Sequence, residues 1–150
     1  MLFRSDKLGP NDVSKTPAAE NLFAAGKGPD LSKVKAQEFH TFVAKALFAC
    51  KRARPDIGTA TIAITTHVQK PKEDDWSRLI RMMRYLNGTR NDKFILSADD
   101  VHVIKWYVDA SFAVHPDFRS HTGSVMTYGG GCAYIPVPQA EAQYEEQHRS

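Results

Sequence analysis

Residues 39–50 read FHTFVAKALFAC, and this stretch decides the first element of the fold. Its apolar side chains recur at the spacing of one buried helical face. They are Phe39, Phe42, Val43, Ala46, Leu47 and Cys50. Ser32 is a suitable N-cap. Lys51 and Arg52 put cations near the C-terminal end, where the helix dipole favours them. The pattern predicts a helix that begins after Ser32 and ends before Pro55.

Two further helices are predicted downstream, and a proline opens each of them. The second runs from Pro55 to about Gln69 on the helical spacing of Ile57, Ala60, Ile64 and Val68. The third follows Pro71, carries acidic residues in its first turn and ends at Gly88, a natural C-terminal cap. Its buried stripe is predicted to be Trp76, Leu79, Ile80 and Met83.

After Gly88 the apolar period changes to alternation, which predicts strands. They are expected at 94–96, 101–110, 123–128 and 133–137, with a hairpin turn at the triple glycine 129–131. Three helices followed by hairpin strands predict an α+β fold. The predicted organisation is a connecting segment 1–31, helices 32–90, a partial sheet domain 91–137 and an acidic tail 138–150 with too little apolar surface to order itself.

The bulk composition is that of a globular protein, with 42% hydrophobic and 25% charged residues among 150. Two cysteines argue against a disulfide-stapled secreted fold. No apolar run approaches the roughly 20 residues that cross a bilayer, and the start has no apolar core typical of a secretory signal. We expect an intracellular protein, in cytoplasm or nucleus, without a membrane partner; the oligomeric state stays open.

Positive charge gathers in the front of the chain. Residues 1–90 hold 16 Lys and Arg against 9 Asp and Glu, whereas residues 91–150 hold 4 against 8. A basic surface of this kind suits contact with nucleic-acid phosphates. Arg78, Arg81 and Arg84 recur every three residues on the third helix, a spacing that can follow a phosphate backbone. The alternative is that they only solvate the helix face opposite Trp76.

Residues that could carry chemistry are few. The cysteines and histidines are dispersed, so they predict no metal site. The triple glycine lacks a following Lys and Ser/Thr, so a hairpin turn is favoured over a phosphate-binding loop. Asp109 differs because a carboxylate near the end of an apolar strand is costly unless it is paired or holds a metal. The alternative is an aspartate that caps the next turn.

Several pieces of the chain, in this order, resemble the Pol polyprotein of copia-type retrotransposons. They are residues 39–48 with 51–57, Trp76 followed by 84–89, and 107–111 with 119–125, and the ordered match covers about 14–131. The resemblance implies that residues up to about 90 come from the thumb and connection of a reverse transcriptase. Residues from about 93 would begin an RNase H domain, a mixed sheet flanked by helices.

The resemblance also implies a role for Asp109. The first strand of that RNase H carries an aspartate that binds two divalent ions, Mg²⁺ or Mn²⁺, and Asp109 occupies its position. We expect Asp109 in the central strand, partly buried, next to the strand that holds 122–128. Residues 107–110 also resemble the polymerase signature Tyr-Val-Asp-Asp, but Ala110 replaces its second aspartate. We therefore assign Asp109 to RNase H.

The site is expected to be incomplete. Two-metal hydrolysis needs several carboxylates. Glu141, Glu145 and Glu146 lie near the right distance along the chain, but their surroundings do not match the family's helix. The sequence thus predicts a catalytically inactive fragment that binds Mg²⁺ weakly or not at all. The alternative is a non-catalytic module whose basic helices hold an RNA–DNA hybrid or another duplex.

The tail carries a prediction of its own, a shift of the reading frame shortly after the triple glycine 129–131, because family character is lost after Cys132. Residues 136–150 can be encoded by codons that, read one base later, give a basic string ending in Lys-Ser-Ser-Thr-Glu-Ala. That string resembles the family's next segment, whose glutamate is the second metal ligand.

Overall fold

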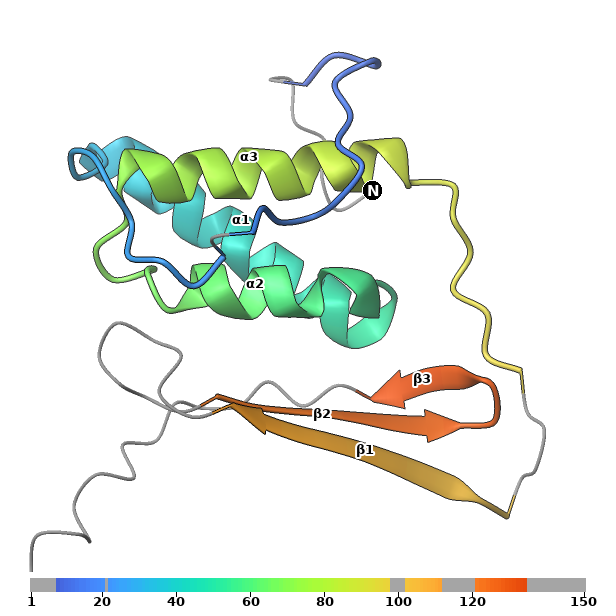
Figure 1. The fold of residues 1–150 in the computed structure, drawn as a ribbon. Helices are drawn as coiled ribbons and strands as arrows, with labels where there is room; N and C mark the ends of the chain where they lie inside the picture. Colours follow the sequence, from blue (N-terminus) through green and yellow to red (C-terminus); the bar gives the residue numbers. More distant parts are fainter. Residues whose placement is uncertain (1–7, 21, 98–101, 112–120, 135–150) are drawn as a thin grey trace, which may run out of the picture. The chain divides into compact units, whose positions relative to one another are not determined.

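The computed structural model describes residues 8–20, 22–97, 102–111 and 121–134. The chain divides into two compact units, Met1–Ile95 and Leu96–Ser150, each considered by itself below (Figure 1). The predicted tail 138–150 and the last residues of the predicted strand 133–137 lie outside the described residues. No helix in the described ranges is both long enough and apolar enough to span a membrane.

The first unit contains the three predicted helices. They are α1 (Lys33–Arg52), α2 (Gly58–Thr65), which follows a short 3₁₀ turn η1 (Pro55–Ile57), and α3 (Glu73–Gly88). Ser32 is confirmed as the N-cap of α1, because its Oγ accepts a hydrogen bond from the Lys35 backbone N–H at 3.3 Å. The second helix is shorter than predicted. The hydroxyls of Thr65 and Thr66 donate back to the carbonyls of Ile62 and Ala63, and such bonds compete with the helical ladder.

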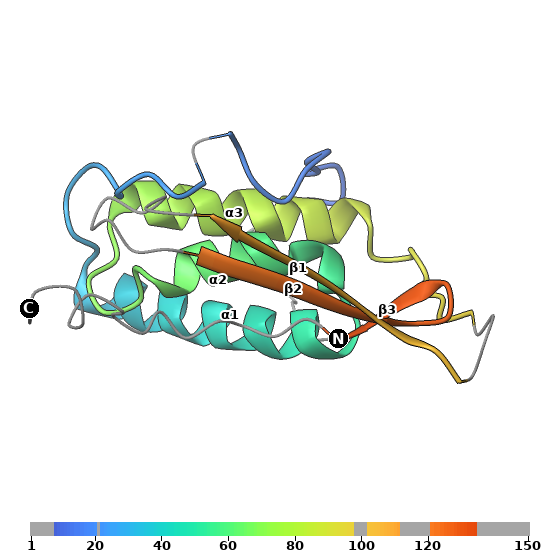
Figure 2. The ribbon, with the colours of Figure 1, turned by 60° about the horizontal axis from the view of Figure 1, so that its bottom comes forward.

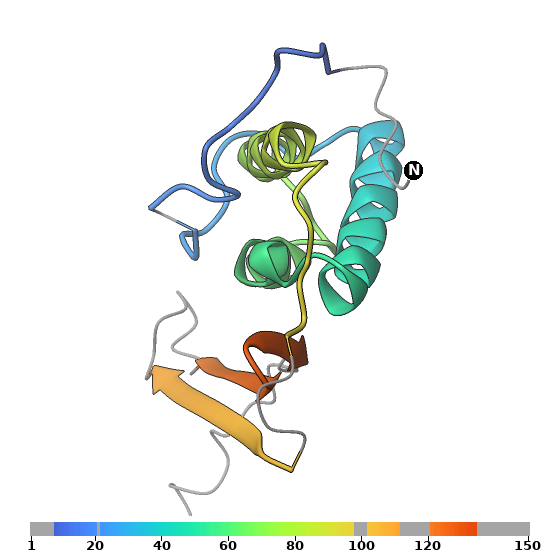
Figure 3. The same ribbon diagram turned by 90° about the vertical axis from the view of Figure 1, so that its right-hand side faces the viewer.

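The three helices pack against one another around a single apolar core (Figure 3). Phe39 of α1, Ile57 of η1 and Leu79 of α3 are fully buried. Each contributes about 1.5–3 kcal/mol relative to an exposed side chain. The rest of the buried cluster consists of Val43, Ala46, Cys50, Ala60, Ile64, Met82, Met83 and Leu86. Trp76 and Ile80, predicted to be buried, are half-buried at the margin of this core.

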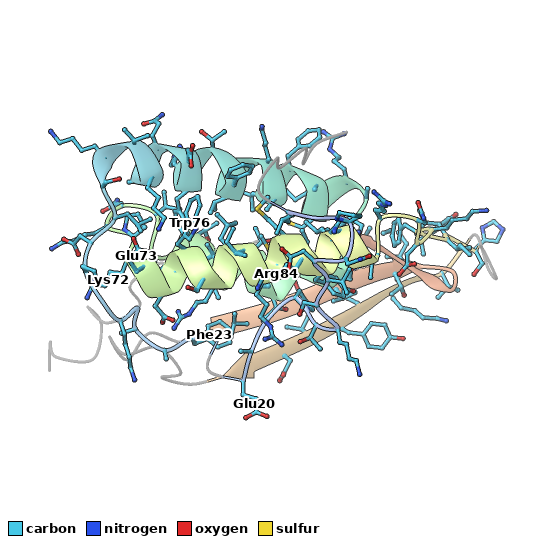
Figure 4. The ribbon with its side chains drawn as sticks, turned by 90° about the horizontal axis from the view of Figure 1, so that it is seen from above. Glu20, Phe23, Lys72, Glu73, Trp76 and Arg84 are labelled. Carbon is cyan, nitrogen blue, oxygen red and sulfur yellow. The ribbon has the colours of Figure 1, made fainter. Side chains whose placement is uncertain are left out.

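Lys35 joins α1 to the start of α3. Its ammonium lies 2.6 Å from a carboxylate oxygen of Glu73 and 5.0 Å from the centre of the Trp76 ring. Figure 4 shows Glu73 and Trp76 together at that end of α3. The Lys35 side chain is partly exposed, and its ammonium therefore combines an ion pair with Glu73 and a cation–π contact with Trp76.

The segment that precedes α1 forms no helix or extended strand within the described residues, apart from a bridge between Asp30 and Lys72. It is not loose, however. Leu8, Ala18 and Leu31 pack against the helical core. The connecting segment predicted for 1–31 is thus, over its described part, a packed layer of the helical unit.

The second unit holds an antiparallel sheet of β1 (Ile104–Ser111), β2 (His121–Tyr128) and β3 (Gly131–Tyr134) in the order β1-β2-β3 (Figure 2). The turn between β2 and β3 contains Gly129, whose φ of 72° favours glycine. The predicted α+β fold class is confirmed. The predicted strand at 94–96 is wrong: these residues lie in no strand and expose 41–71% of their surface, because nothing in the described residues pairs with them.

Candidate nucleic-acid interface

Asp109 lies on β1, with its Cα opposite that of Gly123 on β2. Its expected neighbour strand is therefore confirmed. The described residues do not show the expected central and partly buried position: among the described strands β2 is central and β1 is at an edge, and Asp109 is exposed. The reason is that β1 has a strand on only one side among the described residues.

The surroundings of Asp109 do not fit a two-metal centre. Among the described residues, no three histidine, cysteine, aspartate or glutamate side chains gather closely enough to hold a metal ion. Mg²⁺ requires near-octahedral oxygen ligands, and one exposed carboxylate supplies a small part of that set. No catalytic step through a metal can be built from the residues that the structure describes. The metal role of Asp109 stays a prediction.

Arg78 is engaged with other parts of the protein. Its guanidinium donates to the Ala24 carbonyl at 2.8 Å and to Asp74 Oδ2 at 2.8 Å, and it lies 3.6 Å from Asp75 Oδ1. Only 13% of the side chain is exposed. The low exposure of the side chain and these partners leave little room for a phosphate at Arg78. Its nucleic-acid role stays a prediction that the geometry disfavours.

Arg81 and Arg84 also contact the segment before α1. Arg81 donates to the Thr16 hydroxyl at 2.9 Å, and Arg84 Nε lies 3.0 Å from Asp12 Oδ1. Arg84, labelled on α3 in Figure 4, keeps 44% of its side chain exposed. The three arginines therefore tie residues 12–24 onto α3 instead of merely solvating it. Of the three, Arg84 is the most accessible to a phosphate.

A buried carboxylate, which the sequence reasoning missed, organises the start of α3. The Asp75 side chain is 2% exposed and accepts from the Lys72 backbone N–H at 2.9 Å, while its other oxygen lies 2.8 Å from His67 Nδ1. Gly26 packs directly against it, since an added Cβ there would lie 2.6 Å from Asp75 Oδ2. The available signal was its position in the first helical turn, where carboxylates reach back to the N-cap.

A second polar cluster lies at the other end of the helical unit, where the end of α1 meets the end of α3. Arg54 donates to both oxygens of Asp56, at 2.9 and 2.7 Å, and to the Thr89 hydroxyl at 2.6 Å, while the Tyr85 hydroxyl donates to Asp56 at 2.8 Å. Burial raises the pKa of Asp56, but the bonds from Arg54 and Tyr85 outweigh it and hold the pKa below its ordinary value. The bond to Asp56 raises the pKa of Tyr85. We call these four residues the Arg54 clamp.

Cations without such engagements lie on the outside of α1. Lys45, Lys51 and Arg52 are exposed, and none of them has an ion-pair partner within the described ranges. Phe48 is 55% exposed between them, with the Arg52 guanidinium 5.5 Å from its ring centre. We call Lys45, Phe48, Lys51 and Arg52 the α1 basic patch. The sequence signal was available, because Lys45, Phe48 and Arg52 fall on the helix face opposite Phe39 and Val43, and Lys51 lies on its flank.

Three curated proteins resemble the chain. It is 31% identical over 94 residues to the retrovirus-related Pol polyprotein from transposon TNT 1-94 of Nicotiana tabacum, which covers 62% of this chain and 7% of that protein. It is 26% identical over 116 residues to a putative transposon Ty5-1 protein of Saccharomyces cerevisiae, covering 71% of this chain and 38% of that protein. It is 30% identical over 77 residues to the retrovirus-related Pol polyprotein from transposon RE2 of Arabidopsis thaliana, covering 51% and 5%.

The comparisons confirm the predicted resemblance to retrotransposon Pol polyproteins. The chain spans well under two thirds of each of these relatives, from 5% to 38% of their length. No protein-family model matches the chain. No solved structure matches it either.

Proposed function

We propose that this chain is a catalytically incomplete piece of a copia-type Pol polyprotein that runs from the end of the reverse transcriptase into the RNase H domain. The observation that carries the proposal is the order of its parts. A three-helix unit is followed by an antiparallel hairpin whose first strand bears Asp109. The similarity to transposon Pol polyproteins supports the same origin.

The helical unit is the part we assign to the thumb and connection of the polymerase. The residues of the resemblance support this assignment because they meet in space. Arg54 and Asp56 come from the first matching stretch, Tyr85 and Thr89 come from the second, and together they form the Arg54 clamp. Two pieces of the sequence that lie about 30 positions apart thus form one hydrogen-bonded cluster in the structure.

The sheet unit is the part we assign to the start of RNase H. Asp109 would be a metal ligand in the parent protein, where Mg²⁺ or Mn²⁺ would activate water for strand cleavage. In this chain the described residues form no group of three or more histidine, cysteine, aspartate or glutamate side chains that could hold a metal ion. Ala110 also rules out the paired aspartates of a polymerase site. We therefore expect neither polymerase nor nuclease activity.

The test of this proposal is a pair of activity assays on the purified chain. Primer extension on an RNA template and cleavage of an RNA–DNA hybrid, each with Mg²⁺ and with Mn²⁺, should give no product above a protein-free control. Hybrid cleavage that is lost in Asp109→Asn would show that the site is complete after all. Primer extension of any kind would contradict the assignment of Asp109 to the nuclease.

A second candidate function, duplex binding without chemistry, is favoured by the α1 basic patch. Its three cations are exposed, and Phe48 adds an aromatic surface between them. Contacts of this kind release counterions from the phosphate backbone, so binding weakens as salt rises. With about three phosphate contacts, the slope of log K against log salt concentration should be roughly −3.

A charge-reversed triple variant tests the patch. Lys45→Glu, Lys51→Glu and Arg52→Glu together should abolish measurable binding to an RNA–DNA hybrid at low salt. The matched control reverses Lys15, Lys27 and Lys93, which are also exposed, and changes the net charge equally. Equal loss in both variants would mean that only net charge matters. Binding that does not respond to salt would reject phosphate contact altogether.

A further inference from the structure

Phe48 lies at the centre of the solvent-facing side of α1. At 3.6 residues per turn, its direction from the helix axis is opposite to that of Phe39 and Cys50, which are buried in the core. Phe48 itself is 55% exposed. About half of its surface therefore remains in water in the folded chain, where it offers a flat apolar ring to a ligand.

The cations of the α1 basic patch lie on both sides of that ring. Around the helix, Lys45 and Arg52 flank Phe48 on one side, and Lys51 flanks it on the other. The Arg52 guanidinium lies over the Phe48 ring, 5.5 Å from its centre. Residues 39–55 contain no aspartate or glutamate, so no acidic side chain of this stretch interrupts the positive charge. The exposed ring is thus surrounded by cations that belong to its own helix.

This combination specifies the chemistry of a partner. Cations of one sign favour an anionic partner, and lysine is depleted in the centre of protein–protein interfaces, where aromatic residues gather. A nucleic-acid strand carries one phosphate per nucleotide and a flat base beside it. Bases stack on aromatic side chains and on arginine guanidinium planes, so Phe48 and Arg52 both offer suitable surfaces. A nucleic-acid strand therefore matches both the charge and the ring.

The exposed ring distinguishes a single strand from a duplex. In a duplex each base is stacked between its neighbours, so only sugars, phosphates and base edges are open to a side chain. In a single strand a base can stack on a protein ring while the phosphates beside it contact cations. Lys45 and Arg52 lie seven positions apart, which is about 10 Å along the helix axis. This length matches about three nucleotides at roughly 3.4 Å each, enough for one stacked base and its neighbouring phosphates.

We propose that the α1 basic patch binds single-stranded nucleic acid in preference to a duplex, with an unpaired base stacked on Phe48 and the adjacent phosphates held by Lys45, Lys51 and Arg52. The inference rests on the nucleic-acid binding proposed for this patch and adds the form of nucleic acid that the patch prefers. Every base has a flat face, so stacking on Phe48 selects single strands without selecting a sequence. DNA and RNA strands share the two features that the patch recognises.

Fluorescence anisotropy titrations of the full chain test this preference. The ligands are a labelled single strand of about 12 nucleotides without self-complementarity, as DNA and as RNA, and the same strands annealed to their complements. At equal low salt, the unmodified chain should bind either single strand more tightly than the duplex. Phe48→Ala should weaken single-strand binding about tenfold and leave duplex binding nearly unchanged. Val34→Ala, which truncates another exposed apolar residue of α1 outside the patch, is the matched control and should change neither.

Two other substitutions of Phe48 separate stacking from simple apolar contact. Phe48→Trp keeps a flat ring and should bind single strands at least as tightly as the unmodified chain. The fluorescence of its added indole, measured against the unmodified chain, should be quenched by the single strand and not by the duplex. Phe48→Leu keeps apolar bulk but has no flat face, so it should bind as weakly as Phe48→Ala. A Phe48→Leu chain that binds single strands like the unmodified chain overturns the stacking.

The charge-reversed triple variant of the patch distinguishes a failure of this inference from a failure of the proposed duplex binding. If the triple variant loses binding while Phe48→Ala keeps its affinity for single strands, the patch acts through its cations alone and the stacking on Phe48 is overturned. If the triple variant binds like the unmodified chain, both proposals for the patch are overturned. A duplex that binds as tightly as the single strand overturns the preference and leaves the proposed duplex binding in place.

Discussion

Replacing Asp75 by alanine should destabilise the helical unit by about 2–4 kcal/mol. The carboxylate is 2% exposed and serves several groups at once. Its bond to the Lys72 N–H at 2.9 Å is a helix N-terminal cap, worth about 1 kcal/mol. Its bond to His67 at 2.8 Å, once lost, leaves a half-buried polar nitrogen unsatisfied at a cost of about 1–3 kcal/mol. The loss of the ion pair with Arg78 adds little to this destabilisation, since Arg78 keeps its hydrogen bonds to Asp74 and to the Ala24 carbonyl.

Asp74 provides the control on the same helical turn. Its carboxylate pairs with Arg78 at 2.8 Å, but 34% of the side chain is exposed. An i,i+4 pair of this kind contributes only about 0.3–0.5 kcal/mol. Urea unfolding at neutral pH, followed by the circular dichroism signal of the helices, should give Asp75→Ala a much lower unfolding midpoint than Asp74→Ala. Midpoints that differ by less than the error of the two measurements would refute the reasoning that burial of Asp75 gives its bonds their weight.

Three further predictions follow from the same geometry and from the sequence. Gly26→Ala should lower the urea midpoint of the full chain, because its Cβ would lie 2.6 Å from Asp75 Oδ2, and the loss should shrink when Asp75 is alanine as well. The pKa of Asp56 is held below its ordinary value of 3.8, so its carboxylate adds stability above pH 3.8, and this stability is lost as the pH falls through the lower pKa of the folded state. Urea midpoints measured across that acid range should therefore fall more steeply for the unmodified chain than for Asp56→Asn. Genomic DNA that encodes residues 136–150 should, read one base later, give the basic segment that ends in Lys-Ser-Ser-Thr-Glu-Ala; a different string would reject the shift of frame.

The helices could be predicted from sequence because their signals are local. The spacing of Phe39 and Val43 and the Ser32 cap fixed α1 within a turn, and the change of period after Gly88 placed the later strands. The prediction for 94–96 failed since three apolar residues need a facing strand before they form one, and that partner is not a property of the local sequence.

The fate of the arginines could not be predicted for a related reason. Periodicity shows that Arg78, Arg81 and Arg84 follow one another along α3, but not that another part of the chain covers them. Their partners at Ala24, Thr16 and Asp12 lie 54–72 positions away in sequence. The burial of Asp75 depends in the same way on Gly26 and His67, which reach it only after the unit has folded.

The two kinds of basic residue in this protein therefore have different physical roles. An arginine that donates to a carbonyl and a carboxylate and is mostly buried, as Arg78 is, stabilises the fold and offers little of its guanidinium to a phosphate. An exposed cation on the outside of α1, such as Lys51, has no ion pair to give up among the described residues. The difference favours α1 over α3 as the surface for the nucleic-acid binding proposed above. The motif residues Arg54, Asp56, Tyr85 and Thr89 have a structural role of the first kind, because their hydrogen bonds join the end of α1 to the end of α3.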